Sequence, residues 1–279
     1  MRAFHTNCTA PFFANGGKDY CVADFDLLCS VLSALFWRRE NGSISMITDK
    51  EGLKFYKENG LEDIWDGGVH ALLPDLKNID NIAFWAAGKL YALKTQKAPC
   101  VMIDTDFIVW DKLNLQEGVT VAHREELGEA VYPEASAFRM KEDYRFNESW
   151  DWSELACNTA FAAFDSEDFK NYYTDCAIDF ISNAKECDSV LTYMVFAEQR
   201  LLAMCAKEKG VKISALMDYR ELFGKVKYTH LWGYKQVLRE NGAERTAFCR
   251  KAADRIAREF PEYAELLKKV RYLSGYFGG

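Results

Sequence analysis

The segment APCVMIDTDFIVWDK, residues 98–112, places two carboxylates inside an apolar run. Residues 101–103 predict a buried strand, and Asp104 and Asp106 follow it. A buried carboxylate without a partner costs considerable free energy. Because the strands of a parallel α/β sheet end at the edge where ligands bind, we expect both aspartates at that edge. Residues i and i+2 of an extended chain point the same way, so the pair can converge on one divalent cation.

Composition narrows the class of protein. The chain has 279 residues, of which 49% are hydrophobic and 14% aromatic, enough for one large domain with a smaller appendage. A net charge of -7 argues against a nucleic-acid partner, since such proteins usually carry a basic patch. Residues 1–13 lack the apolar core of a secretory signal, and no run approaches the roughly 18 to 20 apolar residues of a membrane span. We therefore expect a cytoplasmic protein.

Short apolar segments alternate with longer segments of helical period, which predicts an α/β fold with a mostly parallel central sheet flanked by helices and a helical C-terminal extension. We expect one domain over residues 1–242, with a nucleotide-binding half at about 1–112 and an acceptor half at about 113–242, followed by a tail at 243–279. Strands are expected at 1–6, 43–49, 99–110, 118–125, 157–164 and 211–216, and helices at 20–41, 50–60, 81–96, 165–184 and 189–209.

Three motifs resemble a known family. Asp104-Thr105-Asp106 resembles the DxD motif of GT-A glycosyltransferases, which follows their nucleotide-binding half. HLWGYK, residues 230–235, is similar to the HxxGxxK element of glycosyltransferase family 8, the family of glycogenin and bacterial lipopolysaccharide galactosyltransferases. Here the spacing is one residue shorter. CNTAFAAF, residues 157–164, resembles the family's FNSG-type strand, with alanine in place of the glycine. The resemblance implies a GT-A type, Rossmann-like fold.

The resemblance also implies an activity. It implies a retaining hexosyltransferase of polysaccharide biosynthesis. Such an enzyme takes a nucleotide diphosphate sugar, which the resemblance implies is UDP-linked, and a glycan or lipid-linked acceptor. Asp104, Asp106 and His230 would hold Mn²⁺ or Mg²⁺, because a neutral imidazole can complete a site with two carboxylates. Gly233 would allow close approach of the diphosphate and Lys235 would supply positive charge to it.

Four further residues are candidates for donor binding. His5 and Thr6 end the first predicted strand, where they can contact the nucleotide. Asp49 ends the second, where it can bind a base or ribose, and it serves equally well as a helix N-cap. Lys89 lies on the helix before the DxD strand, where it either projects toward the diphosphate or covers apolar surface with its stem.

Two of the three catalytic candidates lie on the acceptor side. Glu198 and Gln199 interrupt an otherwise apolar helix, and buried polar groups need partners. They can face the acceptor hydroxyl, or Glu198 can belong to an internal ion pair. Asn158 is the third candidate, because the resemblance places it against the donor sugar.

Two other functions fit part of the sequence. Haloacid-dehalogenase-like phosphatases also use DxD after a strand, with the first aspartate as nucleophile. Their pattern has Thr or Val where this chain has Ile108, and the later GDxxxD does not follow. The other alternative is a catalytically silent nucleotide-sugar-binding scaffold.

The C-terminal tail carries more basic than acidic residues. Eight lysines and arginines stand against five acids from residue 243 onward, and Pro261 divides the segment into two predicted helices. A basic amphipathic helix can lie on an anionic membrane, or it can pack its apolar face on the domain. We expect at most weak, salt-sensitive peripheral contact with the inner face of a membrane.

Overall fold

The computed structural model describes residues 1–218 and 227–277 and contains a seven-stranded sheet. The strand order is β3-β2-β1-β4-β7-β6-β8. The bounds are β1 Ala3–Asn7, β2 Ile44–Thr48, β3 Val69–Ala71, β4 Cys100–Ile103, β6 Val119–Glu125, β7 Ala156–Phe164 and β8 Ile213–Ala215.

Most neighbouring strands are parallel. β1 pairs in parallel with β2 and β4, β2 with β3, and β6 with β8, whereas β7 runs antiparallel to both β4 and β6. The predicted α/β class with a mostly parallel central sheet is therefore confirmed. Because β7 is reversed, its first residues lie at the same edge as the carboxyl ends of β1, β2 and β4.

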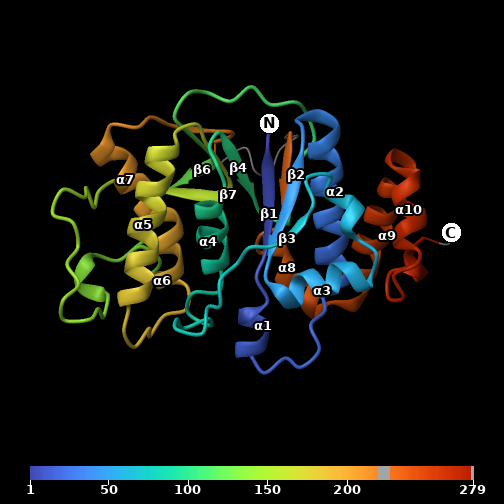
Figure 1. The fold of residues 1–279 in the computed structure, drawn as a ribbon, viewed down its shortest axis with the longest axis horizontal. Coiled ribbons are helices and arrows are strands. Elements are labelled where there is room, and N and C mark those ends of the chain that lie inside the picture. The colour runs from blue at the N-terminus through green and yellow to red at the C-terminus, as the bar shows by residue number, and fades with distance from the viewer. Residues whose placement is uncertain (219–226, 278–279) are drawn as a thin grey trace.

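Helices cover both faces of the sheet (Figure 1). Alternate strand residues face opposite layers: Val101 and Ile103 join the core under α2, and Cys100 and Met102 the core under α4 and α5. The helices are α1 Ala10–Ala14, α2 Asp24–Glu40, α3 Lys50–Glu58, α4 Ala87–Thr95, α5 Glu167–Asn183, α6 Thr192–Val195, α7 Leu201–Lys209, α8 Tyr234–Glu240, α9 Gly242–Glu259 and α10 Pro261–Leu267, with short turns η1 Glu62–Ile64, η2 Ala135–Ala137 and η5 Ser274–Tyr276.

The single strand expected at 99–110 is wrong. The chain leaves the main sheet after Ile103, turns, and forms β5 Phe107–Val109 in a separate two-stranded sheet with β9 Tyr228–His230. The amide of Phe107 donates to the carbonyl of Asp104 at 3.0 Å, so the two aspartates lie in a tight turn rather than on extended chain. Periodicity did not reveal the break, because residues on both sides of the turn are apolar and buried.

The tail packs on α2. The rings of Phe36 and Phe260 meet edge to face with centroids 5.2 Å apart, and Arg245 pairs with the nearly buried Asp24 at 2.6 Å. The apolar side of α9 is thus covered by the domain. Within residues 1–218 and 227–277, no helix combines the length and hydrophobicity that a bilayer crossing requires. The last two residues of the predicted tail, and residues 219–226 of the predicted acceptor half, lie outside the described residues.

Candidate functional site

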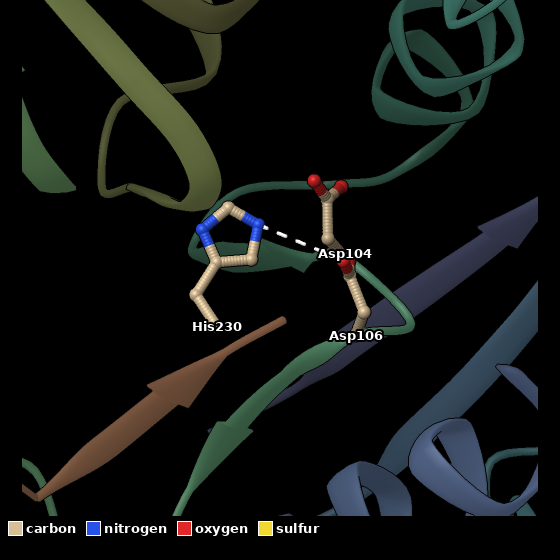
Figure 2. Close-up of side chains that lie close together, drawn as sticks. All are labelled: Asp104, Asp106 and His230. Atoms are coloured by element: carbon tan, nitrogen blue, oxygen red, sulfur yellow. Dashed lines mark ion pairs between the residues drawn. The ribbon is translucent and has the colours of Figure 1, made fainter. Parts of the chain in front are cut away.

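Three potential metal ligands converge at the carboxyl edge of the sheet. The turn after β4 carries Asp104 and Asp106, and β9 carries His230 (Figure 2). One ligand atom from each lies within 4.8 Å of the others. Asp104 is a quarter exposed, while Asp106 is buried. The sequence prediction that these residues meet therefore holds, although a turn rather than an extended strand brings the aspartates together.

The β5–β9 pairing positions His230. Phe107 is its register partner, and the Leu231 amide donates to the Asp106 carbonyl at 3.2 Å. The imidazole Nε2 lies 3.8 Å from Oδ2 of Asp106. Burial lowers the pKa of His230, and the nearby carboxylates oppose this only in part. A neutral imidazole at physiological pH can coordinate a metal ion.

Two lysines neutralise part of the negative charge. Lys235 Nζ lies 3.1 Å from Asp106 and 3.3 Å from Asp26 of α2. Lys89 Nζ lies 2.6 Å from Asp104 and also pairs closely with Glu198. Burial alone would lower the pKa of each ammonium group, but the paired carboxylates outweigh it and raise both pKa values. Both lysines are therefore charged in this site.

The charge of this cluster fits a divalent cation. Its ion pairs join four carboxylates, those of Asp26, Asp104, Asp106 and Glu198, to the ammonium groups of two lysines, which leaves two negative charges. Two carboxylates and one imidazole are oxygen and nitrogen donors suited to Mn²⁺ or Mg²⁺. The residues present thus fit a hard divalent ion between Asp104, Asp106 and His230.

Two connected compartments open beside the cluster. The first, of about 210 Å³, is lined by Asp104, Asp106, Lys89 and the half-exposed Trp85. The second, of about 320 Å³, has aromatic walls at Tyr20 and Tyr56. Thr6, Asn7, Thr105 and Lys235 line both. A larger apolar cavity of about 680 Å³ lies at the opposite, amino edge of β4, away from the charged cluster.

The three candidates from the ends of β1 and β2 have different surroundings. Thr6 lines both compartments, and no described residue gives its buried hydroxyl oxygen a hydrogen-bond partner. His5 is fully buried, and its ring nitrogens contact Ser33 and Trp65. Thr6 is thus placed to contact a ligand directly, whereas the imidazole of His5 lies beneath the site.

Asp49 is the N-cap of α3. One carboxylate oxygen accepts from the Gly52 amide at 2.9 Å, and the other accepts from the amide and hydroxyl of Thr9. The structure favours the N-cap alternative over a direct contact with a base, because both oxygens are already hydrogen-bonded within the protein.

Glu198 and Gln199 lie in a π-helical segment, Phe196–Arg200 (η3), between α6 and α7. Glu198 is buried and accepts from Thr159 at 2.6 Å as well as from Lys89. Gln199 contacts the Tyr132 hydroxyl at 2.6 Å. π-Helical turns are often found at functional sites. This π-helical turn joins the charged cluster to the connection between β6 and β7. Its Glu198 forms an internal ion pair with Lys89, which was the alternative to an acceptor contact.

Asn158 is buried at the start of β7. Its Nδ2 donates to Glu125 at 2.8 Å and its Oδ1 accepts from the Ala160 amide at 3.1 Å. The Tyr132 hydroxyl lies 2.7 Å from the other oxygen of Glu125. Asn158 is therefore anchored through both ends of its amide, and the partly exposed Glu125 is the carboxylate that orients it.

The sequence matches a known protein family over most of its length. Residues 4–270 match DUF6734, a family of unknown function. The chain belongs to this family. No curated protein matches the sequence.

Several solved structures are similar to this DUF6734 member, with sequence identities of 11 to 13%. One is "PaToxG Glycosyltransferase", with a TM-score of 0.42, covering 90% of this chain and 77% of that one. Another is a nucleoside-diphosphate-sugar pyrophosphorylase from Vibrio cholerae RC9, with a TM-score of 0.42, covering 79% of this chain and 93% of that one. A third is mouse xyloside xylosyltransferase 1, with a TM-score of 0.40, covering 82% of this chain and 96% of that one.

Sequence reasoning missed Asp26 and Glu125. Asp26 lies in the first turn of α2, where an acidic residue is ordinary, and only the fold brings it to Lys235. Glu125 ends β6, and its contact with Asn158 depends on the antiparallel β6–β7 register. A single sequence holds no signal for Asp26. The polar end of an apolar strand was a weak signal for Glu125.

Proposed function

We propose that this protein is a metal-dependent glycosyltransferase that transfers a sugar from a nucleotide diphosphate sugar to a hydroxyl group of a glycan or lipid-linked acceptor. The observation that carries the proposal is the convergence of Asp104, Asp106 and His230 with two charged lysines at the carboxyl edge of the sheet. Hard divalent ions commonly bridge protein carboxylates to phosphate oxygens, and this edge is where α/β folds bind ligands.

Asp104, Asp106 and His230 would hold Mn²⁺ or Mg²⁺. The bound ion would supply Lewis-acid stabilisation of the nucleotide diphosphate leaving group. Lys235 lines both compartments and would bind a diphosphate oxygen, exchanging part of its pairing with Asp106 for the ligand. Lys89 would do the same from the side of Asp104. Both ammonium groups stabilise negative charge that grows as the sugar departs.

The donor nucleotide would lie across the two compartments. Thr6 lines both compartments, its buried hydroxyl has no described protein partner, and the second compartment has aromatic walls that can accept a base. UDP is the first choice for the nucleotide, from the family 8 resemblance. Gly233 would let the diphosphate approach the backbone, because among the described residues no atom beyond its chain neighbours lies within 4 Å of the position of an added Cβ.

We propose retention of the anomeric configuration. An inverting enzyme needs a general base that faces the acceptor. Glu198 is buried, with its carboxylate bound to Lys89 and Thr159, and so supports Lys89 rather than offering a free base. Asn158 would contact the donor sugar, as the family 8 resemblance implies, and Gln199 would orient the acceptor. NMR of the product from a defined donor tests this, and an inverted linkage would contradict it.

A thermal-shift screen of UDP- and GDP-sugars with and without Mn²⁺ tests the proposed function. A ligand that binds the native state raises the melting temperature with its concentration. We expect a metal-dependent shift, followed by transfer or slow donor hydrolysis. Hydrolysis of p-nitrophenyl phosphate without any nucleotide-sugar binding would instead support the phosphatase alternative. Tight donor binding without transfer or hydrolysis would support the silent scaffold.

We further propose that residues 1–112 bind the nucleotide, that 113–242 bind the acceptor, and that the protein is cytoplasmic. The basic side of the tail would give at most weak peripheral attachment, since the apolar residues of α9 pack on the domain. Co-sedimentation with anionic liposomes should be slight at low salt and absent at high salt. Binding that survives high salt would contradict this.

A further inference from the structure

Trp232 is an exposed indole beside the candidate metal centre. It lies in the turn between β9 and α8 and is 53% exposed. Its ring stacks on that of His230, with centroids 6.5 Å apart and planes at 22°. A large aromatic side chain normally gains stability by burial. Trp232 gains little in this way, so packing within the protein does not account for a tryptophan at this position.

The backbone of Trp232 is strained. Its φ is +37°, in the left-handed region that bulky residues rarely adopt, and among the described residues other than glycine only Glu186 shares a positive φ. Glycine or asparagine would adopt this conformation at lower cost. Strain of this kind persists where the surrounding structure enforces it, often at ligand sites. Trp232 therefore combines an unfavourable conformation with an exposed side chain.

The turn explains the conformation but not the tryptophan. The Leu231 amide is bonded to the Asp106 carbonyl, and the Lys235 amide donates to the Trp232 carbonyl at 3.2 Å. These bonds bring His230 and Lys235 to the same carboxylate of Asp106. Any residue that tolerates positive φ would complete this turn, so the indole needs a separate reason.

We propose that the indole face of Trp232 is a stacking platform for a sugar ring, which deepens the proposed function and rests on it. The face of an aromatic ring is electron-rich and attracts the polarised C–H groups of a pyranose. Trp232 reaches the cluster through His230 and lines neither compartment, so its face lies at the rim of the site. A nucleobase has other aromatic walls, at Tyr20 and Tyr56.

The substitution Trp232→Asn tests the platform, because asparagine tolerates positive φ and removes the ring. Trp232→Phe keeps an aromatic face. Tyr234→Asn is the matched control, since Tyr234 is a 40% exposed aromatic two residues further on. Melting temperature and Mn²⁺ affinity are measured for all three. We expect Trp232→Asn to melt no lower than the wild type and to bind Mn²⁺ equally well.

Binding is measured by calorimetry with Mn²⁺ for UDP-glucose, UDP-galactose and GDP-mannose, for UDP and GDP, and for methyl glycosides added with the nucleotide. A donor-sugar platform predicts that Trp232→Asn weakens a nucleotide sugar about tenfold and leaves its parent nucleotide unchanged. An acceptor-sugar platform predicts the same loss of about tenfold for the methyl glycosides and no loss for the nucleotide sugars. Either result supports the proposal, provided that Trp232→Phe retains most of the affinity.

Four results would overturn it. Unchanged affinities in Trp232→Asn, with a wild type that binds nucleotide sugar, would refute the platform and leave the proposed function standing. An equal loss for UDP and UDP-glucose would make Trp232 a nucleotide contact. A lower melting temperature with weakened Mn²⁺ binding would make it a support for His230. A wild type that binds no nucleotide sugar would refute both the proposed function and this inference.

Discussion

The ammonium group of Lys235 lies 3.1 Å from the carboxylate of Asp106 and ties helix α8 to the turn after β4. The two residues are far apart in sequence, so the site forms only when the C-terminal part of the chain folds back. In this position Lys235 repels a cation but attracts a diphosphate.

Lys235→Gln should therefore change two affinities in opposite directions. Removing the ammonium group makes the cluster more negative, so Mn²⁺ alone should bind about three- to tenfold tighter, while UDP with Mn²⁺ should bind about tenfold weaker. Isothermal titration calorimetry measures both. Arg239→Gln removes one exposed positive charge from the same helix and should change neither. Parallel changes in both affinities would mean that Lys235 is only structural.

Asp106→Asn should abolish most metal binding. The amide replaces a charged oxygen ligand, so we expect Mn²⁺ affinity to fall more than about tenfold and the Mn²⁺-dependent thermal shift with UDP to disappear. Asp111→Asn removes a carboxylate from an exposed position five residues later and should leave both intact. Full metal-dependent binding or transfer in Asp106→Asn would show that the DTD pair was assigned wrongly.

Gly233→Ala should separate ligand binding from stability. Gly233 has φ -62°, and an added Cβ meets no atom of the described residues within 4 Å, its chain neighbours aside. The free energy of unfolding should thus stay level or rise by about 0.5 to 1 kcal/mol. If a diphosphate occupies this space, UDP affinity should fall. Gly275→Ala, equally open in the tail, is the control for both measurements. Wild-type UDP affinity in Gly233→Ala would place the diphosphate elsewhere.

His5 should make stability depend on pH. Ser33 donates to the Phe107 carbonyl at 2.6 Å, so Nε2 of His5 donates to Ser33, and Nδ1 accepts from Trp65. Burial lowers the pKa of His5 to about 3, and Asp106 opposes this only in part. Between that value and the unfolded pKa of 6.5, the unfolded chain binds more protons.

The free energy of unfolding should accordingly fall as the pH drops below about 6.5, by about 1.4 kcal/mol per pH unit and about 3 kcal/mol by pH 4. Urea unfolding between pH 4 and 8 measures the slope. His5→Gln, which keeps one donor and one acceptor, should flatten the curve below pH 6.5 and leave the slope above pH 7 unchanged. Identical slopes at low pH would contradict this account.

The sequence predicted six strands of the main sheet, because they are short apolar runs between amphipathic helices. It predicted neither β3 nor β9, since each has only three residues, of which at least two are not fully buried, and so shows no period. The break after Ile103 was also missed, because apolar residues are buried on both sides of it. Neither the reversal of β7 nor its place between β4 and β6 is encoded in any local pattern.

The aspartates and His230 were predictable from motifs, whereas the partners of the lysines were not. Glu198 was recognised as unusual, since it interrupts an apolar helix, but its bond to Lys89 required two helices that meet only in the fold. Asp26 gave no signal, because acidic residues are common in a first helical turn. Local chemistry therefore indicated which groups matter, and tertiary packing decided what they contact.

The pairing of Arg245 with Asp24 should hold the tail on the domain. Asp24 is 7% exposed and also accepts from Tyr276 at 2.6 Å. Arg245→Gln leaves this carboxylate without its cation and should lower the free energy of unfolding by about 1 to 2 kcal/mol. Arg250→Gln removes the same charge from an exposed position of α9 and should stay within about 0.5 kcal/mol of the wild type. Urea titrations of both variants measure the difference. Equal stabilities would mean that apolar packing, such as that of Phe260 on Phe36, holds the tail without help from the ion pair.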